Sequence, residues 1–415
     1  MAMIDTDAPA LHLPETYAHG VPYEYYRWLR DNDPVACLPH PRYQGEKFWV
    51  VTRHEDVQRV SRDAATFRNA PDPFMDDGVN APASGGSELL MISLDAPDHI
   101  KLRKLINKGF TPRRVAALGD MLRRRTNDII DSLADRHEAD LVHDLALWLP
   151  LHVIADMVGV PEADRAMVFD WTEKTFGFDP ATTAEERGQA AADMFAYADA
   201  MCAERALDTE PRDDLMSVLL NAEVEGEKLT AFQIELFFML LQNAGSETTR
   251  NLITTGTLAL LQHPDQYELV RGDLSLVPSA IEELLRYSTP VIHFTRTAAV
   301  DTELGGKHIA AGERVLMVYA SANRDERAFT EPDRVDVRRD PNDHVAFGAG
   351  GPHFCLGANL ARIEGRVMFE EILTRFDGLR FVGDPASYDR VHSNLIDGYD
   401  HVPIEWDSVT PSRAS

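Results

Sequence analysis

Cys355 lies in a glycine-rich stretch, residues 347–362, which reads FGAGGPHFCLGANLAR. Three glycines before the thiol, Gly348, Gly350 and Gly351, allow unusual backbone angles and the close approach of a flat ligand. The alanine- and leucine-rich pattern that follows predicts a helix, and the positive end of a helix stabilises a nearby thiolate. A zinc site would need further Cys or His ligands at metal-site spacing, and the sequence offers none beside Cys355.

These residues leave three interpretations of Cys355 open. A catalytic thiol would need a base, and His353 stands two residues away. A buried cysteine in a tight turn would have no chemical role. A single thiolate beneath a large planar cofactor fits the glycine-rich setting best, and this interpretation predicts an axial ligand to haem iron.

A second candidate site is the sequence AGSETT at residues 244–249, inside a long helical pattern. The small residues Ala244 and Gly245 would leave a gap in the helix surface. Thr248 is placed to hydrogen-bond the carbonyl group of Ala244, one turn earlier, which loosens a helix. Glu247 could carry protons from solvent. An ordinary helix bend is the alternative interpretation.

Together the two segments resemble the cytochrome P450 family. The cysteine stretch is similar to the haem-ligand loop of that family, which carries an aromatic residue, glycines, a basic residue or histidine, and Cys-x-Gly. The matching positions are Phe347, Gly348, Gly350, His353, Cys355 and Gly357. The loop has one residue more than usual between the aromatic residue and the cysteine. This length resembles a bacterial branch that acts on sterol side chains, methyl-branched lipids and terpenoids.

The resemblance covers essentially the whole chain and implies roles for further residues. Residues 244–249 are similar to the family's oxygen-activation motif, which implies that Thr248 and Glu247 are catalytic and that Ala244 and Gly245 lie beside the haem. The residues that resemble partners of the haem propionates are His99, Arg103, Arg296 and His353. Glu283, Arg286 and Arg339 resemble a buried structural ion triad, although a Glu-x-x-Arg pair alone is common on helix surfaces.

The implied activity is that of a haem b monooxygenase, which inserts one oxygen atom of dioxygen into a C–H bond of a hydrophobic small molecule. A ferredoxin and an NAD(P)H-dependent ferredoxin reductase would supply the electrons. The alternatives are a peroxide-driven peroxygenase, a non-enzymatic haem sensor and an electron carrier. The Glu247–Thr248 pair favours the monooxygenase, because neither a peroxygenase nor a sensor needs proton delivery for dioxygen cleavage.

A substrate pocket is expected from segments that resemble the family's substrate-contact loops. They are residues 71–90, the region of Phe176 and Phe178, and the positions Ala244, Val291, Ile292 and Leu395. Most of these residues are apolar, so a hydrophobic substrate is expected, although each could equally be part of the core.

The segment 99–114 carries six Lys or Arg residues and no acid, in a chain whose net charge is −27. We call it the basic segment. The overall charge disfavours nucleic acid and anionic membranes as partners. Lys101, Lys104 and Lys108 would face an acidic electron donor, and a solvated helix face is the alternative interpretation.

The elements that must position these residues give a mainly α fold with a smaller β-rich part. The sequence predicts a strand at 48–51, then a helix with a capping box at Thr52 and Glu55. Helical patterns dominate from 91 to 290, and the longest begins at a capping box of Thr230 and Gln233. That helix should span roughly 50 Å, with its apolar first half buried. A hairpin is expected at Gly305 and Gly306.

The resemblance implies the cytochrome P450 fold, with the haem between the long helix and the helix after Cys355. We find no linker or repeat, so a single domain over residues 1–415 is expected, and it should be a monomer. The N-terminal residues carry neither a signal-peptide pattern nor a membrane anchor. Three cysteines are too few and too scattered for a disulfide framework. A cytoplasmic protein is therefore expected.

Overall fold

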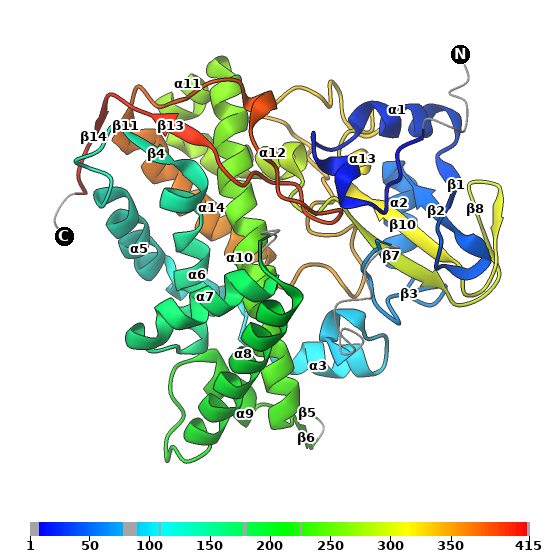
Figure 1. Ribbon diagram of the computed structural model, residues 1–415, viewed down its shortest axis with the longest axis horizontal. Helices are drawn as coiled ribbons and strands as arrows, with labels where there is room; N and C mark the ends of the chain where they lie inside the picture. The colour runs from blue at the N-terminus through cyan, green and yellow to red at the C-terminus, as the bar shows by residue number, and fades with distance from the viewer. Residues whose placement is uncertain (1–7, 78–88, 108, 177–180, 225, 413–415) are drawn as a thin grey trace. The chain divides into compact units, whose positions relative to one another are not determined.

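The computed structural model describes residues 8–77, 89–107, 109–176, 181–224 and 226–412 (Figure 1). The residue contacts divide the chain into two compact units, each assembled from three stretches of chain. Unit 1 comprises Met1–Asp95, Leu258–Cys355 and Ala386–Asp400, and unit 2 comprises Ala96–Thr257, Leu356–Pro385 and His401–Ser415. A single domain over the whole chain stays a prediction.

Unit 1 is built on a five-stranded sheet with the strand order β1-β2-β10-β7-β3. These strands are β1 (Val35–Pro39), β2 (Lys47–Val51), β10 (Arg314–Val318), β7 (His293–Ala298) and β3 (Phe67–Arg68). β10 runs parallel to β2 and antiparallel to β7. Val315 and Met317 of β10 pack in one hydrophobic cluster, while Leu316 and Val318 pack in another, because side chains alternate across a strand. The strand predicted at 48–51 is confirmed as part of β2.

The helices of unit 1 are α1 (Tyr23–Asn32), α2 (His54–Arg62), α11 (Pro264–Gly272), α12 (Val277–Ser288) and α13 (Tyr319–Ala322). The predicted hairpin is confirmed: β8 (Thr302–Leu304) and β9 (Lys307–Ile309) pair antiparallel across Gly305 and Gly306. Both glycines have positive φ, as a tight hairpin turn requires.

The capping box predicted at Thr52 and Glu55 is wrong, although a helix does follow. α2 begins at His54 with Arg53 as its N-cap and without a capping side chain. The Thr52 hydroxyl instead donates to the carbonyl oxygen of Pro34 at 3.1 Å. A partner distant in sequence has taken the hydroxyl that local spacing assigned to the helix.

Unit 2 is mainly helical, as the pattern between residues 91 and 290 predicted. Its helices are α3 (Asp98–Ile106), α4 (Pro112–Ala117), α5 (Gly119–Asp131), α6 (Trp148–Val158), α7 (Arg165–Phe176), α8 (Ala184–Arg205), α9 (Leu215–Asn221), α14 (Ala358–Arg375) and most of α10 (Ala231–Gln262). Short strands pair as β12-β13-β4, β5-β6 and β11-β14. Their bounds are β4 (Glu138–Asp140), β5 (Glu223–Val224), β6 (Glu227–Lys228), β11 (Phe376–Asp377), β12 (Arg380–Phe381), β13 (Pro403–Glu405) and β14 (Ser408–Val409).

One stretch of unit 2, Leu141–Val158, is apolar and long enough to cross a membrane by length and composition. It consists of a π-helical segment, Leu141–Ala146, followed by α6. The protein buries 72% of this stretch, as expected of a core helix, so it is weak support for a membrane span.

α10 is the longest helix of the described chain, and its predicted start is confirmed (Figure 1). The Gln233 N–H donates to the Thr230 hydroxyl at 3.2 Å, and the Thr230 N–H donates to the Gln233 side chain at 3.0 Å. The expected burial is wrong for the first turn, where Phe232 is 48% exposed. Continuous burial instead covers residues 249–260. Polar residues tolerate that burial because the hydroxyls of Thr254 and Thr255 donate hydrogen bonds to backbone carbonyl oxygens one turn earlier.

Candidate functional site

The loop that carries Cys355 is closed by backbone hydrogen bonds within unit 1. The Cys355 N–H donates to the carbonyl oxygen of Phe347 at 2.9 Å, and the Gly348 N–H donates to that of Val345 at 2.9 Å. Cys355 is an exposed thiol that is not part of a disulfide. The helix predicted after it is confirmed as α14, which begins at Ala358. The backbone of the loop therefore holds this thiol in a defined position.

The end of α2 supports the same loop through residues that sequence reasoning missed. Ser61 Oγ donates to the carbonyl oxygen of Gly350 at 2.8 Å, and Arg62 Nε donates to that of Ala349 at 3.1 Å. A Cβ on Gly351 would lie only 2.3 Å from the Ser61 carbonyl oxygen. Ser61 lies 289 positions from Gly350 in the chain, so no local pattern could have marked it.

Glycine is required in this loop by conformation as well as by space. Gly348, Gly350 and Gly351 have φ values of +90°, +92° and +83°, a region that residues with a side chain rarely adopt. The glycines predicted to give the loop unusual backbone angles are therefore confirmed in that respect.

Phe347 is hydrogen-bonded to Cys355 although the loop has one residue more than usual. Its carbonyl oxygen accepts the Cys355 N–H, and its ring centroid lies 6.4 Å from that of Phe354, with an edge-to-face orientation. The centroid of the His344 ring lies 6.0 Å from that of the Phe347 ring. Phe347 is thus placed by a backbone contact and by ring contacts within unit 1.

Glu283, Arg286 and Arg339 make the contacts expected of the buried ion triad. Arg286 Nε and Nη2 each donate to a Glu283 carboxylate oxygen at 2.8 Å, and Arg339 Nε donates to the same carboxylate at 3.0 Å. The side chains of Glu283 and Arg286 are fully buried. Arg286 Nη1 also donates to the backbone carbonyl oxygens of Asn323 and Pro332. A bidentate pair with its other donors satisfied joins separate segments of unit 1 and suits a structural role.

Arg296 is a buried cation whose hydrogen-bond partners carry no negative charge. Its Nη1 donates to the carbonyl oxygen of Thr295 at 2.9 Å, and the nearby Tyr319 and Asp95 side chains interact favourably with its charge. Burial lowers the pKa of Arg296 and raises the pKa of Tyr319, so the phenol stays neutral. An anionic group beside Arg296 would offset the cost of burying its charge.

The other predicted propionate partners are divided between the units. His353 is half-buried in unit 1. His99 is 1% exposed and Arg103 is half-buried, and both lie on one face of α3 in unit 2 because they are four residues apart. Their role toward a haem stays a prediction.

The motif at residues 244–249 lies in an unbroken part of α10. The Thr248 hydroxyl donates to the carbonyl oxygen of Ala244 at 2.9 Å, as the spacing predicted. A Cβ on Gly245 would lie 2.6 Å from Ile154 Cδ1 of α6, whereas the gap expected beside the iron stays a prediction. Gly245 admits a neighbouring helix, whereas Ala244 is exposed.

Glu247 is buried and paired rather than open to solvent. Arg250 Nη2 donates to the Glu247 carboxylate one turn away on α10. Arg250 Nη1 also lies 3.5 Å from the carboxylate of Glu173, a half-buried residue of α7. The structure thus links Glu247 to Glu173 through a guanidinium that the sequence analysis did not single out.

The residues of each unit fit a haem group when each unit is considered by itself. Unit 1 presents an exposed Cys355 thiol, which matches the axial-ligand prediction, and Arg296 is a buried cation suited to a propionate. In unit 2, Ala244 offers an exposed small residue on a helix that is otherwise largely buried near it. Gly357 is the N-cap of α14.

The predicted substrate residues have different environments. Ile292 is fully buried in a hydrophobic cluster with Leu316 and Val318, so its side chain belongs to the core of unit 1. Val291 and Leu395 are half-buried, and the Ile292 N–H donates to the Leu395 carbonyl oxygen at 2.8 Å. The side chain of Phe176, the residue Phe178 and the segment 78–88 lie outside the described part of the structure.

The basic segment is partly compensated by acids from other elements of unit 2. Lys101 of α3 forms an exposed ion pair with Glu227 of β6 at 3.3 Å, and Arg114 pairs with Asp213 at 2.9 Å. Exposed pairs of this kind contribute little to stability, so they leave the charges available to a partner. Lys104 is exposed, and Lys108 lies outside the described residues.

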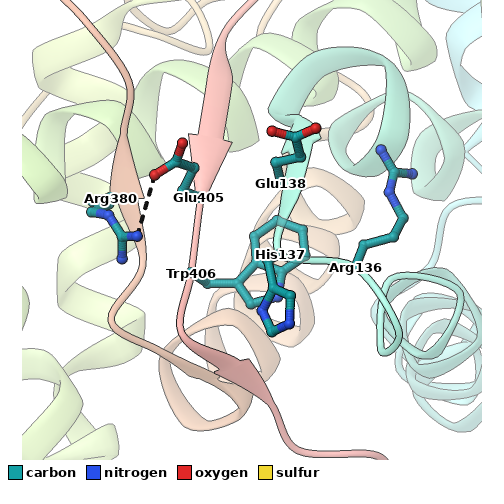
Figure 2. A pocket seen from close by; sticks show the side chains of 6 residues that line it. All are labelled: Arg136, His137, Glu138, Arg380, Glu405 and Trp406. Atoms are coloured by element: carbon teal, nitrogen blue, oxygen red, sulfur yellow. Dashed lines mark hydrogen bonds and ion pairs between the residues drawn. The ribbon is translucent and has the colours of Figure 1, made fainter.

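A polar pocket of about 430 Å³ lies on the β12-β13-β4 sheet of unit 2 (Figure 2). It is lined by Arg136, His137, Glu138, Arg380, Glu405 and Trp406. Arg380 Nη2 donates to Glu405 at 3.2 Å across two paired strands. The pocket contains none of the predicted site residues, and its charged lining differs from the apolar pocket expected for the substrate.

Comparison with known families gives a match over more than half of the chain. The family model described as cytochrome P450 matches residues 151–386. A steroid C26-monooxygenase of Rhodococcus jostii is 37% identical over 96% of this chain and 84% of its own length. A methyl-branched lipid omega-hydroxylase of Mycobacterium tuberculosis is 41% identical over 91% of this chain and 89% of its own length.

Solved structures give the same result. A cytochrome P450 from Chondromyces apiculatus has a TM-score of 0.86 at 35% identity, over 97% of this chain and 98% of that chain. A cytochrome P450 from Mycobacterium marinum in complex with pseudoionone also has a TM-score of 0.86, at 34% identity over 97% of this chain and 98% of that chain.

Proposed function

This chain belongs to the cytochrome P450 family and is a haem b monooxygenase, and from that premise we propose that Cys355 ligates the haem iron while Thr248 and Glu247 control proton delivery. The bound haem supplies the activation of dioxygen, which protein side chains cannot perform themselves. The chain binds and orients the reactants, excludes water and moves protons.

The observation that carries the proposal is the environment of Cys355 compared with the other two cysteines. Cys355 is an exposed thiol in a loop closed by backbone hydrogen bonds. Cys202 is buried, and burial raises its pKa to about 11. Cys37 is exposed on β1, where desolvation nevertheless raises its pKa. Since a metal ligand must be a thiolate, Cys355 is the best candidate.

Proton delivery is assigned to the residues on α10. The Glu247 carboxylate forms an ion pair with Arg250, and Arg250 in turn contacts the half-buried Glu173 of α7. Rotation of the Arg250 side chain toward Glu173 would release Glu247 to accept a proton. Thr248 would pass that proton on with its hydroxyl, which now donates to Ala244. This proton path uses only side chains of unit 2.

Arg296, His353, His99 and Arg103 are assigned to the haem propionates, and Glu283, Arg286 and Arg339 to structural support. Arg296 supports its assignment best, because it is buried with neutral hydrogen-bond partners. The Glu283 carboxylate accepts hydrogen bonds from both arginines within unit 1, which supports a structural assignment.

We assign a hydrophobic small molecule as the substrate, to be hydroxylated at a C–H bond. Steroids and methyl-branched lipids are the first candidates, because two relatives are named for reactions on these compounds. The half-buried apolar residues Val291 and Leu395 support this assignment. A ferredoxin with its reductase is assigned as the electron donor, and the cytoplasm as the compartment, where cysteines remain reduced.

The haem-loaded protein should be screened with steroids, methyl-branched lipids, terpenoids and aromatic compounds for a high-spin shift of the haem spectrum. Compounds that give a shift are then incubated with NADH, ferredoxin and reductase, or with hydrogen peroxide alone. Hydroxylated product from the NADH system supports the proposal. Product from peroxide alone would favour a peroxygenase, and a spin shift without product in either system would favour a sensor.

A further inference from the structure

Two histidines meet in unit 2 at a place that the monooxygenase assignment does not use. His143 lies in the π-helical segment Leu141–Ala146, which follows β4. His401 lies two residues before β13, the strand that pairs with β4. The pairing of β13 with β4 therefore brings the two histidines together. π-helical turns are rare and often occur at functional sites.

The two imidazoles are placed like a pair of metal ligands. Their ring centroids are 4.7 Å apart with the planes inclined at 43°. Ligand nitrogens of the two rings lie within 4.8 Å of each other. Zinc–nitrogen bonds of about 2.0–2.1 Å place two tetrahedral nitrogen ligands roughly 3.4 Å apart, so a small rotation of one ring would suffice.

Asp140 fixes the orientation of His401. The Asp140 carboxylate contacts His401 Nδ1 at 2.8 Å, and the same carboxylate accepts the backbone N–H of Val142 at 2.8 Å and of His143 at 3.1 Å. Its position is therefore set by the backbone of the π-helical segment. A carboxylate bonded to one nitrogen of a histidine is the usual support for a metal at the other nitrogen, here Nε2.

His143 carries a buried polar atom that lacks a protein partner. Among the residues that the structure describes, His143 Nε2 is buried and makes no hydrogen bond. Leaving a buried polar atom without a partner destabilises the folded protein, so a ligand at this position would remove a penalty. Both rings thus point to Nε2 as the ligand atom.

We propose that His143 and His401 form a binding site for a divalent transition-metal ion, with Zn²⁺ as the simplest occupant. Asp400 directly precedes His401 in the chain, so a further carboxylate is kept near one of the two proposed ligands. Water completes the coordination on the side of His401, which is exposed. The bound ion joins the start of β13 to the π-helical segment and stabilises unit 2.

The test uses the haem-loaded protein and Zn²⁺ alone, titrated in competition with a chromophoric zinc chelator. The parent protein should bind one equivalent of Zn²⁺ that His143→Ala and His401→Ala each lose. His137→Ala removes an exposed histidine from the same unit and should keep that equivalent. Zn²⁺ should also raise the thermal unfolding midpoint of the parent and of His137→Ala, because a ligand of the native state stabilises it.

Asp140→Asn provides a variant that retains an oxygen acceptor for the helix N-terminus but no longer supports His401 as a carboxylate. It should weaken zinc binding by about 10–100-fold, as is typical when the group that supports a metal-binding histidine is changed, without unfolding the protein. Equal zinc stoichiometry and affinity in the parent, His143→Ala and His401→Ala would overturn the proposal. Unchanged affinity in a folded Asp140→Asn would overturn the assigned ligand atom of His401.

Discussion

Thr248 shows why a residue type alone does not mark a catalytic position. Its hydroxyl donates to the carbonyl oxygen one turn earlier on α10, and Ser246 and Thr254 make the same kind of bond. What distinguishes this position is exposure, because Ser246 and Thr254 are buried whereas Thr248 is only half-buried. Proton delivery is therefore assigned to Thr248 by its environment.

Replacing Thr248 by Ala should divert electrons from substrate to peroxide. The substrate-induced spin shift should remain, and NADH should still be consumed. Product per NADH should fall by about 10²-fold or more, the usual contribution of a positioned proton donor. Thr254→Ala removes the same backbone bond at a buried position and serves as the control. If Thr248→Ala couples NADH to product as well as Thr254→Ala does, the assignment fails.

At the scale of elements, α2 and the cysteine loop act as one assembly. A Cβ at Gly351 would collide with the Ser61 carbonyl oxygen, and an alanine there would also have to adopt a positive φ. Gly351→Ala should therefore lower thermal stability and weaken haem retention. Gly383→Ala isolates the conformational cost, since Gly383 has φ +90° and open space around it. That control should cost roughly 1–2 kcal/mol. Equal destabilisation by the two variants would show that α2 does not constrain the loop.

α14 contains a buried acid that should make stability depend on pH. Glu364 is fully buried, and burial raises its pKa to about 8. The unfolded chain loses this proton above pH of about 4.3, whereas the folded protein keeps it until about pH 8. The stabilising contribution is thus complete below the unfolded pKa and is lost as pH rises toward 8.

Glu364→Gln should remove this dependence. Urea unfolding of both proteins at pH 4, 6 and 8 gives the comparison, with pH 4 as the internal reference. The stability of Glu364→Gln relative to the parent should rise by a few kcal/mol between pH 4 and pH 8. A pH-independent difference between the two proteins would show that Glu364 is not held neutral.

For the whole molecule, local charge must overcome a net charge of −27 if an acidic ferredoxin is to bind. Lys101 and Lys104 of the basic segment are exposed on α3, and the Lys101–Glu227 pair is a weak surface pair. Charges at the rim of an interface mainly change association rates and their salt dependence.

The double variant Lys101→Glu with Lys104→Glu should keep the substrate-induced spin shift and slow reduction by ferredoxin. The difference should be largest at low salt, where screening is weakest. Lys174→Glu with Arg187→Glu makes the same change in net charge on α7 and α8. Stopped-flow reduction at several ionic strengths compares the variants, and equal rates in both would place the ferredoxin elsewhere.

The elements with local signals were predicted well from the sequence. The Thr230–Gln233 capping box, the hairpin at Gly305 and Gly306, and the helix after Cys355 each follow from residues close together in the chain. The triad on Glu283 could be proposed only through resemblance, since its arginine at 339 is 56 positions away.

The remaining features depend on contacts between distant segments. Ser61 reaches the loop that carries Cys355, Arg250 pairs with both Glu247 and Glu173, and Ile154 fills the space beside Gly245. These contacts could not be predicted from the sequence. The residue types are common, and each contact depends on how separate elements pack or on side-chain geometry, neither of which follows from spacing along the chain. The histidine pair of His143 and His401 was missed for the same reason.

The central claim is that Cys355 ligates the haem iron, and the ferrous–CO difference spectrum tests it most directly. Cys355→Ser should lose the red-shifted Soret band that thiolate ligation produces, because serine does not supply a thiolate. Cys37→Ser and Cys202→Ser, which change the other two thiols, should retain the band. Retention of the red-shifted band by Cys355→Ser, or its loss in either of the other two variants alone, would contradict the account.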